Sequence, residues 1–347
     1  MMAGATLLGA SAGAFIVTAA SILALRRVAL RVGLVDYPGG RKTHEGLVPL
    51  VGGLGMVLGI AVGLLMSGNT GGALQPYLAS ALLLAVVGAL DDNFALSPGL
   101  RLLAQVGAVL PMVLGMGVRI QTFGDLVGIG PLDVGDASLA VTVFVTVAAI
   151  NAFNLVDGMD GVAGGVVLAA LVVFLSLGPA AIDPASAVLA TILAASVAGF
   201  LVFNAPVPWD NTRYKCFMGD AGSTMLGFSL AWLLIRTSQG SHPVLAPVTA
   251  LWIVFVPAVD LLWSVLRRTL RRQSILRADG EHLHHMLCRA GLGPVAVAAC
   301  IVGVTLCAGI SGVALEIAGV PAWGSFAAWW LAGAVLVGSV TLAARPR

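Results

Sequence analysis

The sequence predicts an all-α, polytopic membrane protein with about 11 transmembrane helices. Of its 347 residues, 59% are hydrophobic and only 10% are charged, and the mean hydropathy is +1.01. Soluble globular proteins carry about 25% charged residues, so this composition excludes a soluble domain. A bilayer is spanned by roughly 20 apolar residues. The apolar segments of about this length are 3–25, 50–67, 73–90, 100–117, 137–155, 161–178, 185–203, 221–238, 244–266, 293–316 and 325–344.

The basic residues predict the orientation of these helices. No basic residue precedes the first apolar segment, whereas Arg26, Arg27 and Arg31 follow it, so we expect a retained helix and not a signal peptide. With the N-terminus outside and the helices alternating, 16 of the 18 Lys and Arg residues fall on the inner side. Only Arg119 and Arg236 fall outside. The positive-inside rule supports this topology, which also predicts a cytoplasmic C-terminus.

This topology makes residues 1–347 a single integral-membrane domain. The cytoplasmic loops expected to carry the active site are about 26–49, 91–100, 156–161, 204–220 and 267–292. On the outer side, apolar residues alternate around Gly128 and Gly130, which predicts a short external β-hairpin near 118–136. The four cysteines show no paired spacing, so no disulfide framework is predicted.

Oxygen-bearing side chains recur at the end of the fifth apolar segment, in NAFNLVDGMDG. Asn151, Asn154, Asp157 and Asp160 follow one another at three-residue spacing, which would place them on neighbouring strips of a helix. Uncompensated charge at the end of a membrane-length helix is costly and by default indicates a functional site. The predicted topology places this motif on the cytoplasmic side.

Two further acidic motifs fall on the same side. Asp91 and Asp92 end the third apolar segment, where the helix macrodipole disfavours acids. We therefore expect a compensating cation, with a merely solvated helix end as the alternative. Asp220, in GDAGST at the start of the eighth segment, either caps that helix or lies beside a bound phosphate. An oxygen-only ligand set with phosphates present favours Mg²⁺.

Basic side chains on this face are candidates for holding an anion. Lys42, Arg101, Arg213 and Lys215 all lie in the predicted cytoplasmic loops or at their edges. Each one alone would be interpreted as a positive-inside anchor. Their convergence with the carboxylates on one face is what indicates a binding site.

A histidine motif, HLHH, lies in the longest cytoplasmic loop. His282, His284 and His285, together with Cys288, suggest a zinc site as one alternative. On a helix, however, His282 and His285 would share a face while His284 would point elsewhere, which makes one tetrahedral site awkward. Contact with a sugar nucleotide fits this motif better.

Taken together, the motifs resemble those of the polyprenyl-phosphate N-acetylhexosamine-1-phosphate transferases. The resemblance covers roughly residues 30–291. It is carried, in this order, by DYPGGRKTHEGLVPLVGG, GALDDNF, NAFNLVDGMDG, RYKCFMGDAGST, VTALWIVFVPAVD and HLHH. The branch that transfers phospho-MurNAc-pentapeptide typically has Thr-Pro-Thr-Met-Gly-Gly where this chain has LVPLVGG, and it differs in the histidine motif. The resemblance therefore favours the branch that uses UDP-GlcNAc.

The resemblance implies a role for each matching residue. Mg²⁺, or Mn²⁺ in its place, would be held by Asp220 and Asn154. The residues with implied catalytic roles are Asp91, Asp92, Asp157 and Lys42. Phe217 and Asp160 match positions that hold the uracil ring. The other residues expected to bind substrate are Arg101, Arg213, Lys215, His44, His282, His284 and His285. Thr212 departs from the pattern, because relatives often carry a second Arg before RYK.

The resemblance also implies an activity. The enzyme would transfer GlcNAc-1-phosphate from UDP-GlcNAc to undecaprenyl phosphate, giving undecaprenyl-diphosphate-GlcNAc and UMP, and would initiate lipid-linked cell-envelope polysaccharide synthesis. The same chemistry with another UDP-N-acetylhexosamine or with UDP-MurNAc-pentapeptide is the alternative. A membrane transporter is the alternative from another class, but transporters place ionisable groups near the bilayer midplane. Because a phosphomonoester is mostly dianionic at neutral pH, we expect direct attack, with a covalent aspartyl-phosphate as the alternative.

The expected setting follows from the same resemblance. We expect a multi-pass protein of the bacterial inner membrane that forms a homodimer, contacts membrane lipids and faces the cytoplasm with its active site. No nucleic-acid partner is expected.

Overall fold

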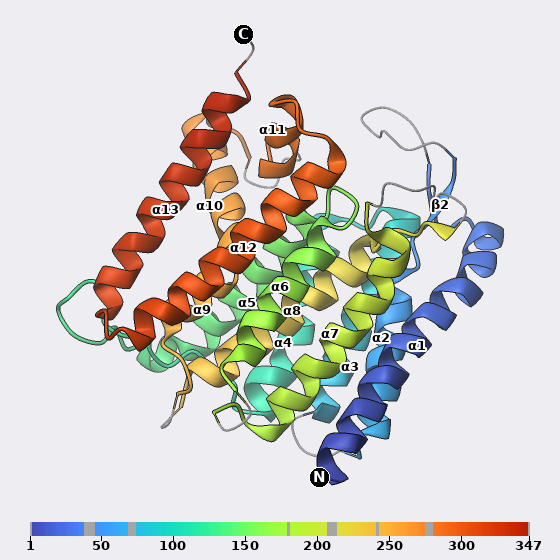
Figure 1. The fold of residues 1–347 in the computed structure, drawn as a ribbon, viewed down its shortest axis with the longest axis horizontal. Helices are drawn as coiled ribbons and strands as arrows, with labels where there is room; N and C mark the ends of the chain where they lie inside the picture. Colours follow the sequence, from blue (N-terminus) through green and yellow to red (C-terminus); the bar gives the residue numbers. More distant parts are fainter. Residues whose placement is uncertain are drawn as a thin grey trace.

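The computed structural model describes residues 2–37, 46–68, 74–178, 181–206, 214–240, 243–274 and 280–345, most of them helical (Figure 1). The α-helices are α1 (Met2–Val32), α2 (Gly52–Met66), α3 (Leu74–Phe94), α4 (Pro98–Leu110), α5 (Ser138–Val156), α6 (Val162–Ser176), α7 (Pro184–Asn204), α8 (Gly219–Ser238), α9 (Pro247–Ile253), α10 (Phe255–Leu270), α11 (Leu283–Arg289), α12 (Pro294–Ile317) and α13 (Ala322–Ala343). The shorter elements are β1 (Val35–Asp36), β2 (Val48–Pro49), the π-helix η1 (Pro111–Gly115) and the 3-10 helix η2 (Gly135–Ala137).

The helices have the length and composition of a multi-pass membrane protein. Seven segments of the described chain are long and apolar enough to cross a bilayer, or eight if α9 and α10 are one bent span. Two further helices, α2 and α6, are apolar but have only 15 residues each. Figure 1 shows the N-terminus and the C-terminus at opposite ends of the molecule. The predicted all-α polytopic fold is confirmed.

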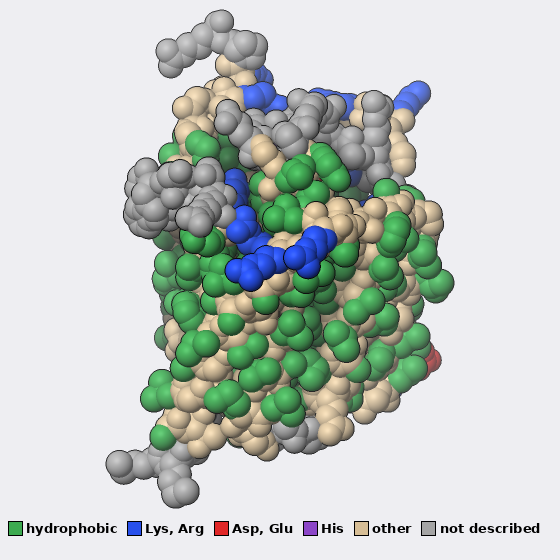
Figure 2. Space-filling model, turned by 90° about the vertical axis from the view of Figure 1, so that its right-hand side faces the viewer, with side chains coloured by type: hydrophobic (Ala, Val, Ile, Leu, Met, Phe, Trp, Pro, Cys, Tyr) green, Lys and Arg blue, Asp and Glu red, His purple; other side chains and the backbone are tan. Residues whose placement is uncertain are grey.

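The surface of the molecule has an apolar part and a basic part. On the face shown in Figure 2, hydrophobic side chains cover most of the side of the bundle, whereas Lys and Arg gather toward one end. Large apolar residues are exposed on helices at the outside of the bundle, for example Ile16 on α1 and Leu331 on α13. Such a surface is compatible with lipid, because lipid tails, unlike water, do not penalise exposed apolar side chains.

Prolines explain two irregular helices. Pro257 has no N–H to donate to the carbonyl of Ile253, and α9 and α10 meet just before it at an angle of 88°. Pro111 stands where α4 changes into the π-helix η1. The bend after α9 is important for the site, because it directs α10 toward α11 (Figure 1).

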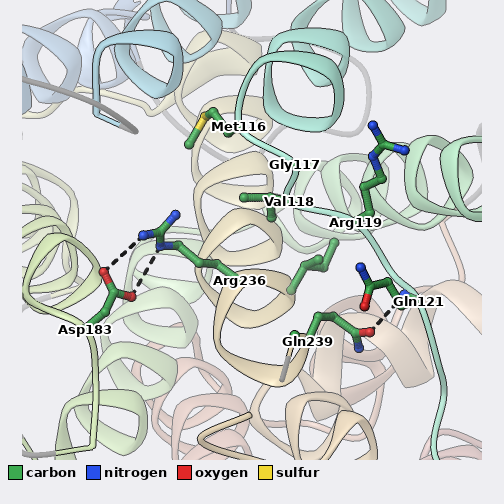
Figure 3. Close-up of a pocket in the computed structure, with 10 residues that line it drawn as sticks. Met116, Gly117, Val118, Arg119, Gln121, Asp183, Arg236 and Gln239 are labelled. Atoms are coloured by element: carbon green, nitrogen blue, oxygen red, sulfur yellow. Dashed lines mark hydrogen bonds and ion pairs between the residues drawn. The ribbon is translucent and has the colours of Figure 1, made fainter. Parts of the chain in front are cut away.

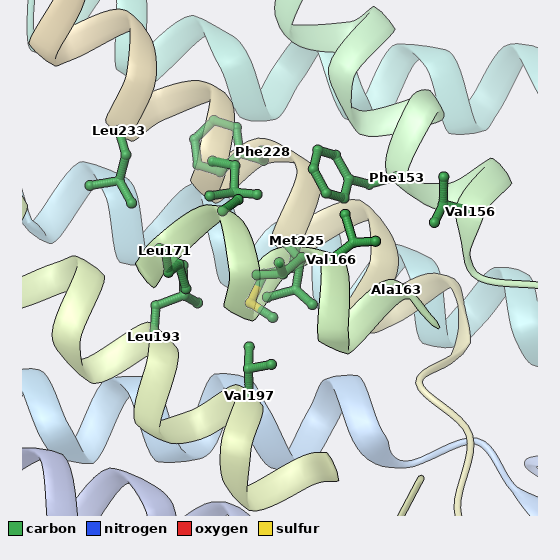
Figure 4. Close-up of a cluster of buried hydrophobic side chains, with 14 of the residues drawn as sticks. Phe153, Val156, Ala163, Val166, Leu171, Leu193, Val197, Met225, Phe228 and Leu233 are labelled. Atoms are coloured by element: carbon green, nitrogen blue, oxygen red, sulfur yellow. The ribbon is translucent and has the colours of Figure 1, made fainter. Parts of the chain in front are cut away.

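The central helix is α8, of which almost every residue is buried. Side chains of α5, α6, α7 and α8 pack against one another there, including Phe153, Val166, Leu193 and Phe228 (Figure 4). At its start α8 lies close against α3, because a Cβ added at Gly88 would overlap the backbone of Ala221. Small residues allow helices in membranes to approach this closely. This contact brings the end of α3 against the first turn of α8.

A short hairpin forms within the predicted segment 118–136, because the backbone N–H groups of Phe123 and Val134 donate to the carbonyls of Leu132 and Gln121, at 3.0 and 2.8 Å. The segment contains one isolated antiparallel bridge, between Thr122 and Asp133, and no strand. Gly124, Gly128 and Gly130 all have positive φ angles there, so the chain turns between the two paired stretches. The described strands lie elsewhere: β1 and β2 pair antiparallel, with Val35 opposite Pro49 and Asp36 opposite Val48.

A cavity of about 300 Å³ lies at the C-terminal end of α8, away from the predicted site (Figure 3). It is lined by both of the basic residues that the topology places outside, Arg119 and Arg236. The Arg236 guanidinium donates from Nε and Nη2 to the two oxygens of Asp183, at 3.2 and 3.3 Å. Asp220 lies sixteen positions earlier on the same helix, which at 1.5 Å per residue is roughly 24 Å away. The cavity is therefore separate from the acidic motifs.

Candidate active site

Three acidic motifs that are far apart in the sequence meet at one end of the bundle. Asp220 in the first turn of α8 lies beside Asn154 in the last turn of α5, whose Nδ2 donates to Asp220 Oδ1 at 2.8 Å. The same Nδ2 donates to Ser223 Oγ at 3.0 Å. Asp92 at the end of α3 accepts a hydrogen bond at Oδ1 from the backbone N–H of Asp220, at 3.0 Å. The structure thus brings together the two predicted metal ligands, Asn154 and Asp220, and the predicted catalytic residue Asp92.

Asp91 and Asp92 are compensated in different ways. Asp91 accepts from the backbone N–H of Leu96 at 2.8 Å and from Arg101 Nη1 at 3.0 Å. Asp92 faces the N-terminal end of α8, where the macrodipole stabilises a negative charge. Protein groups therefore compensate the charge of Asp91, whereas they compensate that of Asp92 only in part. Arg101 Nη1 also lies 3.8 Å from Asp220 Oδ2, so this one guanidinium lies beside two carboxylates.

One carboxylate oxygen of these motifs is buried without a contact that would compensate its burial. Asp92 Oδ2 is buried and has no hydrogen-bond partner among the residues that the structure describes. Burying such an atom without a partner costs free energy, unless a ligand or a cation completes its contacts. The acidic cluster, defined here as Asp91, Asp92, Asp157 and Asp220, is therefore suited to receive positive charge.

Asp157 follows α5 directly and lies in the same electrostatic environment. Its side chain keeps some solvent exposure, but the surrounding protein is dense. Burial, and then the negative charges of Asp220, Asp92 and Asp160, raise the pKa of Asp157 to about 8. Without a cation, this carboxyl group therefore holds a proton at neutral pH. Perturbed pKa values of this kind are typical of catalytic sites.

Asn151, the first member of the three-residue series, does not join the cluster. Its Nδ2 donates to Gln105 Oε1 on α4, at 2.8 Å, and to the Val147 carbonyl, at 2.7 Å. This contact joins α5 to α4 one turn deeper in the bundle. The role of Asn151 in the described structure is to connect two helices.

A second group of predicted residues lies together beside the cluster. Lys215 Nζ is 2.5 Å from Asp160 Oδ2 and 5.0 Å from the centre of the Phe217 ring. A cation over an aromatic face is an attractive arrangement. The two residues expected to hold a uracil ring, Asp160 and Phe217, are thus connected through one lysine.

One residue that holds this second group in place was missed by the sequence analysis. Asn204, buried at the end of α7, accepts from the backbone N–H of Gly161 at 2.8 Å and donates to the Cys216 carbonyl at 3.0 Å. It therefore fixes the two loops that carry Asp160 and Phe217. The available signal was a single amide at the end of an otherwise apolar helix.

The histidine motif is arranged differently from the prediction. His282 and His285 do not share a helix face, because α11 begins only at Leu283 and His282 precedes it. His282 and His284 are buried and their rings are stacked with centroids 5.9 Å apart, whereas His285 is exposed. Among the described residues, no three His, Cys, Asp or Glu side chains are grouped to hold a metal ion. The zinc alternative gains no support.

The remaining predicted site residues lie outside the described part of the chain. They are Lys42, His44 and Arg213.

Fold and site define a class: a multi-pass helical membrane protein with an acidic, amide-containing site at one end of its bundle. A family model described as glycosyl transferase family 4 matches residues 74–238, which include the acidic cluster. The chain is also similar to curated proteins named undecaprenyl-phosphate α-N-acetylglucosaminyl 1-phosphate transferase. That of Yersinia pestis is 37% identical over 280 residues, which cover 80% of this chain and 75% of the relative. That of Haemophilus influenzae is 36% identical over 336 residues, or 96% of this chain and 92% of the relative.

The Escherichia coli K12 protein of the same name is 37% identical over 281 residues, with coverage of 80% and 75%. Identity at this level over most of both chains establishes the relationship. The chain belongs to glycosyl transferase family 4, in the group of undecaprenyl-phosphate α-N-acetylglucosaminyl 1-phosphate transferases. This confirms the family resemblance derived from the sequence motifs.

Proposed function

We propose that the protein transfers GlcNAc-1-phosphate from UDP-GlcNAc to undecaprenyl phosphate, giving undecaprenyl-diphosphate-GlcNAc and UMP. The names of its relatives support this activity. The observation that carries the proposal is the meeting of Asp92, Asn154 and Asp220 at one end of the bundle. Phosphoryl transfer depends mainly on positioning and charge neutralisation, and this is the arrangement of groups that such a reaction requires.

Mg²⁺, or Mn²⁺ in its place, is the cofactor that suits these side chains. Mg²⁺ usually takes only one or two carboxylates, with water and substrate phosphates as its other ligands. Asp220 and Asn154 would hold it, and the unpartnered Asp92 Oδ2 provides further negative charge beside them. When bound, the cation neutralises charge that develops on the leaving phosphate.

The acidic residues also suit the lipid substrate. Asp91 and Asp92 end α3, where a phosphate on a lipid can arrive from the bilayer. The lipid phosphate is mostly dianionic at neutral pH, so these carboxylates would orient it together with the bound cation. Once the charge of that cation has displaced the proton of Asp157, Asp157 would accept a remaining proton. The raised pKa of Asp157 suits it to this proton transfer near neutral pH. Arg101, beside Asp91 and Asp220, would contact the pyrophosphate of the donor.

The donor would bind over the second group. Phe217 and Asp160 would hold the uracil ring by stacking and hydrogen bonding, and Lys215 holds these two side chains together. His285, exposed on α11, is the histidine best placed to contact the sugar or its phosphate. Lys42, His44 and Arg213 would add positive charge or polar contacts from the loops.

The membrane topology is part of the proposal. Eleven crossings result if the seven long spans and the bent α9–α10 pair are joined by α2, α6 and the buried α8. With the N-terminus outside, 16 of 18 basic residues face inward. The C-terminus and the active site would then be cytoplasmic, in a bacterial inner membrane. A homodimer is the proposed assembly.

Purified protein incubated with undecaprenyl phosphate and a panel of UDP-sugars tests the function, with UMP release as the readout. We expect release with UDP-GlcNAc, and much less with UDP-GalNAc or UDP-MurNAc-pentapeptide. Preference for another UDP-sugar would correct the substrate, and no release with any of them would contradict the reaction. A transporter would release no UMP.

A further inference from the structure

A buried carboxylate that the mechanism does not use lies under the histidine motif. Asp260 on α10 is 1% exposed and His282 is 5% exposed. Asp260 Oδ2 lies 2.9 Å from His282 Nδ1. The other oxygen, Oδ1, accepts a hydrogen bond from the backbone N–H of Leu283 at 3.0 Å. Leu283 is the first residue of α11, so one carboxylate fixes both the imidazole and the start of the helix.

The contact with Asp260 favours one proton position on the imidazole, because at 2.9 Å it is the shorter of two polar contacts at Nδ1; the other, with Ser264 Oγ, is 3.4 Å long. An ionised carboxylate can only accept hydrogen bonds, so the Nδ1 atom facing Asp260 carries the proton. In its neutral form, His282 then has a lone pair on Nε2. A carboxylate holding the tautomer and orientation of a histidine is a device found beside catalytic and ligand-binding imidazoles.

Burying the contact between Asp260 and His282 costs free energy. Taking a carboxylate out of water costs several kcal/mol, which a partner in good geometry has to offset. Apolar residues of similar size would pack α10 against α11 without that cost. The pair therefore indicates a need for a defined orientation of this segment, which packing alone would not supply.

The far side of the same segment touches the catalytic loop. A Cβ added at Gly158 would overlap the imidazole of His284. Cys288 Sγ lies 3.6 Å from Met159 Sδ. Leu283–Arg289 is therefore held between α10 on one side and the loop that follows Asp157 on the other. Asp260 is therefore connected, through His282 and Leu283, to the segment that carries His285 and touches the 157–160 loop.

We propose that Asp260 is a positioning residue for donor binding, which sets the tautomer of His282 and the orientation of α11 and, with it, of His285. This rests on the proposed function, in which the histidine motif faces the sugar nucleotide. Asp260 touches neither substrate in this assignment and acts only through the residues of the histidine motif.

Asp260→Asn isolates the effect of the carboxylate. The amide oxygen of Asn can still accept from Leu283 N–H, so α11 keeps its first hydrogen bond. The amide nitrogen then faces His282 Nδ1 as a donor, which requires Nδ1 to accept and moves the imidazole proton to Nε2. The substitution conserves shape and reverses the direction of one hydrogen bond.

The matched control is Asp183→Asn. Asp183 also accepts from a backbone N–H at a helix start, that of Ser186, and also contacts a nitrogen-bearing side chain, that of Arg236, but it lies near the C-terminal end of α8, away from the histidine motif. Two measurements are made on each variant: steady-state kinetics with each substrate varied separately, and ¹⁵N chemical shifts of the histidine imidazoles in detergent micelles.

We expect Asp260→Asn to raise the KM for UDP-GlcNAc at least tenfold while the KM for undecaprenyl phosphate changes less than twofold. The ¹⁵N shifts should report Nδ1–H in the native protein and Nε2–H in the variant, and Asp183→Asn should leave both readouts unchanged. An unchanged donor KM in Asp260→Asn, or an unchanged tautomer, would overturn the proposal. If the native protein releases no UMP from any UDP-sugar, the proposed function fails, whereas the ¹⁵N experiment still decides whether Asp260 sets the tautomer.

Discussion

Asn154 Nδ2 donates to Asp220 Oδ1 at 2.8 Å, although 66 residues separate the two in the chain. The contact joins the last turn of α5 to the first turn of α8 and places the two predicted metal ligands together. In the same region Asp92 caps the start of α8. The chemistry proposed here therefore depends on three helix ends that meet at one point.

Activity should depend on a divalent cation and on Asp220. We expect EDTA to abolish UMP release and Mg²⁺ or Mn²⁺ to restore it. Asp220→Ala should lower kcat by at least on the order of 100-fold at every Mg²⁺ concentration, because the variant lacks the proposed carboxylate ligand. Asp136→Ala, at the exposed helix η2, is the control and should keep native kinetics. Substantial turnover by Asp220→Ala in the same assay would remove Asp220 from the metal site.

Asp91→Asn and Asp92→Asn should affect the chemical step more than donor binding. Asn keeps the shape and can still accept the hydrogen bonds from Leu96 or Asp220, so the helix ends should persist. The lost charge acts on the lipid phosphate and in the transition state, so kcat should fall far more than the KM for UDP-GlcNAc rises. Steady-state kinetics with each substrate varied in turn measures both. Variants that lose donor affinity while keeping kcat would reverse the assignment.

Native cysteines provide a test of topology. Cys288 is exposed on α11, Cys216 is buried, and Cys300 and Cys307 lie on the exposed side of the apolar helix α12. A membrane-impermeant maleimide should therefore label the protein at Cys288, and only after the cells are opened. Cys288→Ser should abolish that labelling. Labelling of Cys288 in intact cells would place the histidine motif outside and exclude the proposed cytoplasmic site.

Gly158→Ala should disturb the contact between the catalytic loop and the histidine motif. The added methyl group would overlap the His284 ring, and overpacking of this kind costs about 1–3 kcal/mol. Thermal inactivation in detergent should occur at a lower temperature, and the double variant Gly158→Ala/His284→Ala should recover part of the loss. Gly99→Ala is a matched control, because no atom lies within 4 Å of the added Cβ. Equal stabilities of the Gly158 and Gly99 variants would show that the contact does not form.

Stability should fall in mild acid because of His284. Burial, and then the charge of His285, lower the pKa of His284 from its usual 6.5 to about 3. Between these two values the unfolded chain binds a proton that the folded protein does not. The neutral form therefore stabilises the fold fully above about pH 6.5, and this contribution is lost progressively as the pH falls. The temperature of inactivation, measured from pH 7.5 to pH 5, should decline less steeply in His284→Asn than in the native protein. Identical slopes would contradict the buried, neutral state of His284.

Much of this protein follows from the sequence alone. Apolar length and charge asymmetry depend only on composition along the chain, so the multi-pass helical fold was predictable from them. The motif order was sufficient to indicate the family. The grouping of Asp91, Asp92, Asn154 and Asp220 on one face followed from alternating helices, which return every second helix end to the same side of the membrane.

Contacts between helices could not be predicted in this way. Spacing along a chain predicts which residues are neighbours on one helix, but the packing of different helices decides which side chains meet across long separations. Asp260 and His282, Asn204 and Cys216, and His284 and Gly158 meet only because the bend after α9 and the close approach of the loops bring them together. The same packing determines that His282 and His284 are buried while His285 is exposed. From spacing alone, His282 and His285 were expected to share a face and His284 to point elsewhere. The sequence by itself determined which chemistry is present at this end of the bundle, and the tertiary structure decided which of those residues hold the others in place.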